Sequence, residues 1–139
     1  MVVNAAFDKQ LMISVSNKVG TLAEVTHIIS SSGINLVALC AYAIDNTVAI
    51  MFVTEDNNEA KRVLEERNFH VAEEEVILLT IENKAGALQT VTEKIAEAGI
   101  DLTLIYGSVE KEGNFTRIVL ISRDNMEAMM VIKMMLERR

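Results

Sequence analysis

Two short segments of the sequence combine residue types that suit the binding of a small polar molecule. Val15-Ser16-Asn17-Lys18-Val19-Gly20-Thr21-Leu22 recurs later in the chain as Ile81-Glu82-Asn83-Lys84-Ala85-Gly86-Ala87-Leu88. In each segment an apolar run precedes Asn-x-x-Gly and an apolar pattern of period 3.6 follows it, which predicts a strand, a tight turn and a helix start. Such a turn offers unpaired backbone N–H groups, partial positive charge and, at glycine, close access to the backbone. We therefore place the candidate site at these two turns.

The composition excludes several classes of protein. Half of the 139 residues are hydrophobic and 24% are charged, which is typical of a globular protein with a packed core. Thirteen basic and 20 acidic residues give a net charge of −7, which disfavours binding to nucleic acid or to an anionic membrane surface. No window approaches 18 uninterrupted apolar residues and no export signal stands at the N-terminus, so we expect a cytoplasmic protein.

The elements around the first turn follow from the apolar pattern. Residues 2–7 and 11–15 are apolar runs separated by Asp8-Lys9-Gln10, which predicts a hairpin. A helix is expected from Gly20, with Thr21 and Glu24 forming a capping box, and Gly33 should end it. Strands are predicted at 34–44 and 48–53, joined by a tight turn at Asp45-Asn46. A second helix, capped by Asp56, should end near Arg67.

The second half of the chain repeats this order. Gly33-Ile34-Asn35-Leu36 recurs as Gly99-Ile100-Asp101-Leu102 in the same register as the turns, and Asp124-Asn125 matches Asp56-Asn57 at a spacing that is longer by two. The two additional residues belong to the exposed turn at 110–114. We therefore divide the chain into domains at residues 1–68 and 69–139. Glu73-Glu74-Glu75 is interpreted as an exposed, charged turn before the strand at 76–81.

One strand is missing from each repeat if both are to form a ferredoxin-like sandwich. That fold needs four antiparallel strands with two helices on one face. Each repeat begins with a short extra strand, Val2–Phe7 or Phe69–Ala72, which we place at a sheet edge. The prediction is an α+β protein of two ferredoxin-like, circularly shifted units with antiparallel sheets and helices on one face. The sequence leaves open which unit each extra strand completes.

The repeated pattern resembles the ACT domain, a small regulatory module that binds amino acids in enzymes of amino acid metabolism. The resemblance rests on apolar-x-Asn-x-x-Gly-x-Leu, a helix, and Gly-Ile-Asn/Asp-Leu opening the next strand, and two copies cover about residues 3 to 136. The segment Val2 to Asp8 is also similar, more weakly, to the entry of the paired ACT region of aspartate kinases. The resemblance implies a homodimer, formed where sheets continue edge to edge, and an amino acid biosynthetic enzyme as a partner.

A free amino acid needs donors for its carboxylate, an acceptor for its ammonium and a pocket for its side chain. The asparagine of each turn can both donate and accept. Resemblance to the serine-responsive phosphoglycerate dehydrogenases implies a second polar contact from Asn35 or Asp101, and Asp101 would balance an ammonium but oppose a carboxylate. The residues that we assign to the ligand sites are Asn17, Lys18, Val19, Gly20, Thr21, Leu22, Asn35 and Leu36 in the first repeat, and Asn83, Lys84, Ala85, Gly86, Ala87, Leu88, Asp101 and Leu102 in the second.

The sequence departs from the family pattern at two places. Val19 and Ala85 stand where many members have proline, which removes rigidity from the turn and not chemistry. Serine-binding members place histidine two residues before the motif asparagine, whereas this chain has Val15 and Ile81, which argues against serine in that pose. The same turns also have a purely structural interpretation, in which the asparagines bond their own turn and the glycines only satisfy backbone angles.

Other functions find less support in the residues. No nucleophile and base, no paired carboxylates and no phosphate-cradling arginine of the acylphosphatase type stand out, so we expect neither catalysis nor a cofactor. RNA-recognition modules present aromatic residues and basic charge, whereas this chain is acidic and 4% aromatic. His27, His70 and Cys40 do not form a metal-binding cluster and are expected to be ordinary surface or strand residues. The alternative function is an adaptor or regulatory subunit without a ligand. The last helix has more methionines than one buried stripe can use, and a protein–protein surface could use the rest.

Overall fold

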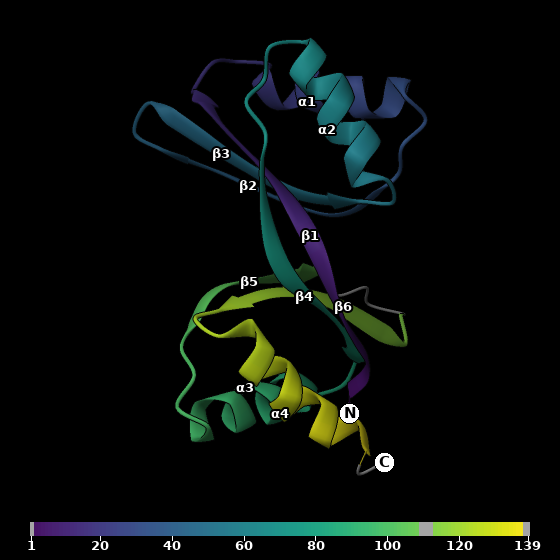
Figure 1. Ribbon diagram of the computed structural model, residues 1–139, viewed down its shortest axis with the longest axis vertical. Coiled ribbons are helices and arrows are strands. Elements are labelled where there is room, and N and C mark those ends of the chain that lie inside the picture. The colour runs from purple at the N-terminus through teal and green to yellow at the C-terminus, as the bar shows by residue number, and fades with distance from the viewer. Residues whose placement is uncertain (1, 109–112, 138–139) are drawn as a thin grey trace. The chain divides into compact units, whose positions relative to one another are not determined.

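The computed structural model describes residues 2–108 and 113–137. The elements follow one another as β1 (Val2–Ser16), α1 (Thr21–Ser31), β2 (Leu36–Ile44), β3 (Thr47–Thr54), α2 (Asn57–Glu66), β4 (Ala72–Glu82), α3 (Ala87–Glu97), β5 (Leu102–Ser108), β6 (Phe115–Ser122) and α4 (Asn125–Glu137) (Figure 1). The fold is α+β with two ferredoxin-like units, as the sequence predicts. Most of the turn expected at 110–114 lies outside the described residues.

The chain forms two compact units, which are not simply its N-terminal and C-terminal halves. The first unit is Lys9–Glu74, and the second unit combines Met1–Asp8 with Glu75–Arg139. Strands β1 and β4 therefore each run from one unit into the other. The division into domains at 1–68 and 69–139 follows the repeat along the sequence and stays a prediction, whereas these units are defined by contacts.

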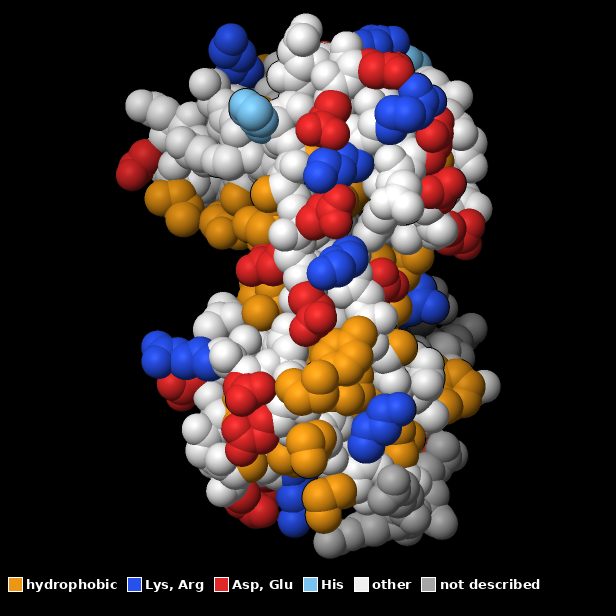
Figure 2. Space-filling model, in the orientation of Figure 1, with side chains coloured by type: hydrophobic (Ala, Val, Ile, Leu, Met, Phe, Trp, Pro, Cys, Tyr) orange, Lys and Arg blue, Asp and Glu red, His pale blue; other side chains and the backbone are white. Residues whose placement is uncertain are grey.

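In the first unit, β3 lies between β2 and β1 and is antiparallel to both, with Leu11 opposite Phe52 and Cys40 opposite Met51. Helices α1 and α2 lie on one face of these strands (Figure 1). Their apolar stripes cover the core because residues three and four apart share a helix face. Charged side chains gather on the outer surface over these helices (Figure 2). The buried core consists of Leu11, Ile13, Val25, Ile28, Ile29, Ile50, Phe52, Ala60, Leu64 and Val71.

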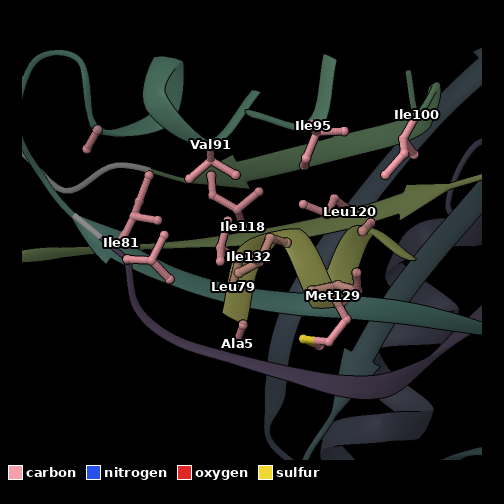
Figure 3. Close-up of a cluster of buried hydrophobic side chains, with 14 residues drawn as sticks. Ala5, Leu79, Ile81, Val91, Ile95, Ile100, Ile118, Leu120, Met129 and Ile132 are labelled. Atoms are coloured by element: carbon pink, nitrogen blue, oxygen red, sulfur yellow. The ribbon is translucent and has the colours of Figure 1, made fainter. Parts of the chain in front are cut away.

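In the second unit, β6 lies between β4 and β5 and is antiparallel to both, with Leu79 opposite Ile118 and Ile105 opposite Leu120. Side chains of α3 and α4 point to those of the strands in a single cluster (Figure 3). The buried members are Val2, Ala5, Ile77, Leu79, Ile81, Ala87, Val91, Ile95, Ile100, Ile118, Leu120, Ala128, Met129 and Ile132.

The two cores show which unit each extra strand completes. Val2 and Ala5 are buried in the core of the second unit, although they precede the first repeat in sequence. Val71 is buried in the core of the first unit, and Phe69 packs against it. Each unit is thus completed by the segment that precedes the other repeat.

The predicted hairpin at the N-terminus is wrong, because β1 is one continuous strand from Val2 to Ser16. The polar residues 8–10 stay in the strand because the fully buried Gln10 finds a partner. Its Nε2 donates to Glu74 Oε1 at 3.3 Å. The turn predicted at residues 73–75 is also wrong, since these glutamates belong to β4. The extra strand predicted at 69–72 begins only at Ala72.

Helices α1 and α2 begin where the sequence predicts, but only one of the two predicted N-terminal caps is present. Helix α1 begins after Gly20, but its capping box is wrong, because Thr21 Oγ1 donates to Lys18 O at 3.1 Å instead of capping the helix. The left-handed φ of 90° at Gly20 sets this geometry. The cap of α2 is confirmed, since Glu59 N donates to Asp56 Oδ1 at 3.2 Å.

Gly107 in β5 is required by the close approach of β6. A Cβ at this position would lie 2.5 Å from Ile118 Cδ1 and 2.7 Å from the carbonyl oxygen of Arg117. Because the backbone of β6 cannot yield as a side-chain end can, we expect Gly107→Ala to lower the free energy of unfolding by about 1–3 kcal/mol. Urea unfolding followed by circular dichroism measures this loss, and an unchanged midpoint would contradict the close approach.

Candidate functional site

The first turn connects β1 to α1 and is held to the hairpin between β2 and β3. The backbone N–H of Asn17 donates to Asn46 O at 2.7 Å, and Thr21 N donates to Lys18 O at 3.3 Å. A Cβ at Gly20 would meet no neighbouring atom within 4 Å, so the space beside the turn is open. A ligand could therefore approach the backbone at this point.

The polar groups of the first turn have few partners within the protein. Within residues 2–108 and 113–137, the backbone N–H groups of Val19, Gly20 and Leu22 have no acceptor. In the same ranges the side chains of Asn17 and Lys18 make no hydrogen bond or ion pair, and both residues are exposed. The turn combines free N–H donors, an amide that donates and accepts, and a cation, a set that suits a carboxylate carrying an amino group.

The second turn, between β4 and α3, has the same backbone but different side-chain contacts. Its asparagine N–H donates to Asn114 O at 2.9 Å, matching the first turn, and Gly86 has a left-handed φ of 86°. The side chain of Asn83 is already engaged, with Nδ2 donating to Gly113 O at 2.8 Å. Lys84 Nζ lies 3.1 Å from Glu82 Oε2. Both polar side chains of this turn are thus held by the protein itself.

Asn35 and Asp101 do not lie beside the turn of their own unit. The turn at Asn17 follows Ser16, which is paired with Thr47 at one end of β3, whereas Leu36 is paired with Thr54 at the other end. The seven steps along the strand from Thr47 to Thr54 place these ends about 23 Å apart. The second unit has the same register, with Glu82 opposite Phe115 and Leu102 opposite Ser122.

Instead, the two residues at the far end each pair with a side chain from the segment after the central strand. Asn35 Nδ2 donates to Glu55 Oε2 at 3.2 Å, and Asp101 Oδ2 lies 3.5 Å from Arg123 Nε. Sequence reasoning missed both pairs because their spacing follows neither a helix nor a strand period. The hairpin neighbour Asn46 could have been found, since a tight turn between β2 and β3 must return the chain to the end of β1 in this topology.

The structure gives no indication of a metal site or a membrane segment in its described part. Across residues 2–108 and 113–137, no three His, Cys, Asp or Glu side chains cluster in a way that could hold a metal ion. His27 and His70 are both exposed. No helix in the described ranges has the length and apolar character needed to cross a membrane.

Comparison with known proteins agrees with this fold. Residues 6–137 match the family model of an ACT domain pair. The crystal structure of protein BT0572 from Bacteroides thetaiotaomicron is similar with a TM-score of 0.86 and 27% identity, over 94% of this chain and 90% of that one. The ligand-free regulatory subunit of aspartate kinase from Thermus thermophilus has a TM-score of 0.67 and 13% identity, over 96% and 97% of the two chains. None of the curated proteins compared matches the chain.

Proposed function

The chain belongs to the ACT domain family, and we propose that it is a non-catalytic regulatory protein that binds a small amino acid at the turn between β1 and α1. The observation that carries this proposal is the first turn itself, where the side chains of Asn17 and Lys18 have no partner within the described residues. The backbone N–H groups of Val19, Gly20 and Leu22 also have no acceptor there. The carboxylate would accept from the N–H groups, because a helix start carries partial positive charge. The amide oxygen of Asn17 would accept from the ammonium.

A complete ligand pocket requires a second surface in this proposal. A ligand at Asn17 cannot also contact Asn35 of its own unit, because about 23 Å of sheet separates them. We expect the second surface to come from another copy of the chain. The edge strand β2 supports such pairing, since Leu36, Leu39, Tyr42 and Ile44 are exposed along it. Exposed apolar edges are where sheets continue from one chain to another.

Regulation would follow from the difference in ligand affinity between two arrangements. An amino acid that bridges two surfaces favours the arrangement in which both contact it, and only by its differential affinity. The similarity in fold to aspartate kinase regulatory subunits supports an enzyme of amino acid biosynthesis as the regulated partner. The second turn should bind less tightly or not at all, because a ligand there would have to displace the contacts of Asn83 and Lys84.

Thermal unfolding in the presence of each of the twenty amino acids tests the proposal. A ligand at 100 times its dissociation constant should raise the free energy of unfolding by about 2.7 kcal/mol. Asn17→Ala and Gly20→Val should abolish the increase, the first by removing the amide and the second by closing the open turn. Asn83→Ala is the matched control and should retain the increase. Equal loss in Asn17→Ala and Asn83→Ala would contradict the assignment to the first turn.

The alternative is an adaptor that acts by protein contact and has no ligand. The full exposure of Val19, at the same end of the unit as the exposed Ile44, favours it, because apolar side chains gathered at one end can serve a partner surface. If none of the twenty amino acids changes the unfolding temperature at millimolar concentration, the adaptor function is the one that remains.

A further inference from the structure

Helices α2 and α4 occupy equivalent places in the two units, which makes one a natural reference for the other. Asn57 and Asn125 open the two helices with matching hydrogen bonds, so the helices can be compared position by position. Four exposed positions of α2 correspond to four exposed positions of α4. They are Asn58, Arg62, Glu65 and Glu66 on α2, and Met126, Met130, Lys133 and Met134 on α4.

The outer face of α2 is an ordinary solvated surface. Arg62 forms ion pairs with both Glu59 and Glu66. The guanidinium hydrogen bond of Arg62 holds the pKa of the Glu59 carboxyl below its usual value. Lys61 Nζ lies 3.1 Å from Glu73 Oε1. The fold therefore places no demand for apolar side chains on this face of the helix.

The outer face of α4 is apolar at the same positions. Met126, Met130 and Met134 are 64%, 63% and 54% exposed. Because they are four residues apart, they form one stripe along the helix, which we call the methionine face. Orange side chains are visible on the second unit in the same view that shows charged side chains over the helices of the first unit (Figure 2).

Two hollows lie along the methionine face. One has a volume of about 380 Å³ and is lined by Met129, Met130, Lys133 and Met134. The other, of about 190 Å³, is lined by Lys94, Val131, Met134 and Met135. Methionine is unbranched and polarizable, so such hollows adapt to the side chains that enter them. Lys133 lines the larger hollow and Lys94 lines the smaller one, where Lys94 Nζ lies 3.4 Å from Glu97 Oε2.

We infer that the methionine face is a docking site for an amphipathic helix of another protein, with an apolar stripe over Met130 and Met134 and acidic residues beside Lys133. An apolar helix stripe fits a shallow groove of this kind through side chains three and four residues apart. Lys133 selects acidic flanks, because opposite charges across an interface steer association and like charges oppose it. The same lysine disfavours a second copy of this face.

The experiment uses the full chain and two synthetic helical peptides of about 16 residues, near the length at which isolated helices become stable. Both carry the same leucine stripe, one with glutamate flanks and the other with lysine flanks. Fluorescence anisotropy should show binding of the acidic peptide at least tenfold tighter than the basic peptide. The double variant Met130→Arg, Met134→Glu gives α4 the residues of α2 and should weaken binding at least tenfold. Met130→Leu keeps the face apolar and should retain binding.

The charge contribution has its own variant. Lys133→Glu should weaken binding of the acidic peptide and strengthen binding of the basic peptide. Circular dichroism verifies that each variant stays folded. Equal affinity of the two peptides for the wild-type chain, or no binding at millimolar concentration, would overturn the inference. So would sedimentation showing a dimer that dissociates in the double variant, which would assign the face to a second copy. Binding to anionic vesicles without binding to either peptide would assign it to a membrane and overturn it as well.

Discussion

Ala5→Asp is expected to destabilise the second unit strongly, although residue 5 is far along the sequence from most of the core that it joins. The side chain of Ala5 is buried in the same apolar cluster as Ile77, Leu79 and Ile132. Figure 3 shows this cluster. A carboxylate at that position would be transferred from water to an apolar core without a partner, which costs several kcal/mol. We expect the free energy of unfolding to fall by at least about 3 kcal/mol, a large part of the stability of a small domain.

Ala6→Asp is the matched control, because Ala6 is the same residue type one position later and is exposed. This variant should change the free energy of unfolding by no more than about 0.5 kcal/mol. Urea unfolding monitored by circular dichroism compares the two variants, and hydrogen exchange in β6 locates the effect. If the two variants lose stability equally, the terminal segment does not complete the second unit.

The repeat explains why the fold could be predicted to this extent. Apolar residues at helical spacing, such as Val25 and Ile29, predict the buried faces of the helices, and both of these residues are buried. The turn pattern indicated a backbone constraint at the two motif glycines, and Gly20 and Gly86 both have a left-handed φ of nearly the same value. These features are local, so the sequence within about ten residues contains the information that determines them.

The errors in the predicted strands concern long-range contacts. A polar run such as 8–10 normally marks a turn, but Gln10 is held in a strand by Glu74, which is 64 residues away. Local pattern cannot reveal such a partner. The unit that each extra strand completes could not be predicted for the same reason. Two repeats with equivalent apolar strands leave the pairing ambiguous until the contacts of Val2 and Val71 are known.

The candidate site was predictable as a pair of turns but not as two unequal turns. Asn17 and Asn83 occupy the same motif position, and nothing near them in the sequence indicates that only Asn83 Nδ2 finds a carbonyl, that of Gly113. That carbonyl lies in the longer hairpin connection, where the second repeat carries its two additional residues. The longer connection is thus associated with a contact to the side chain of Asn83, 30 residues earlier in the chain. This contact distinguishes the two sites.

Asn57→Ala is expected to cost the first unit about 2–3 kcal/mol, because the side chain makes three hydrogen bonds worth about 1 kcal/mol each. Its Oδ1 accepts from Thr54 N at 2.9 Å and from Thr54 Oγ1 at 2.8 Å, and its Nδ2 donates to Lys9 O at 2.7 Å. These bonds join the start of α2 to the strand β1 at the point where the first unit begins. The same bonds recur in the second unit, where Asn125 contacts Ser122 and the carbonyl of Glu75.

Asn58→Ala provides the control, since Asn58 is an exposed residue of the same type in the same helical turn. Alanine favours a helix over asparagine by less than about 0.7 kcal/mol, so this variant should be neutral or slightly more stable. Thermal and urea unfolding measure both variants, and hydrogen exchange at the start of α2 should rise only in Asn57→Ala. A neutral Asn57→Ala would show that water replaces these bonds at no cost, and the link between helix and strand would then rest on apolar contacts such as that of the fully buried Ala60.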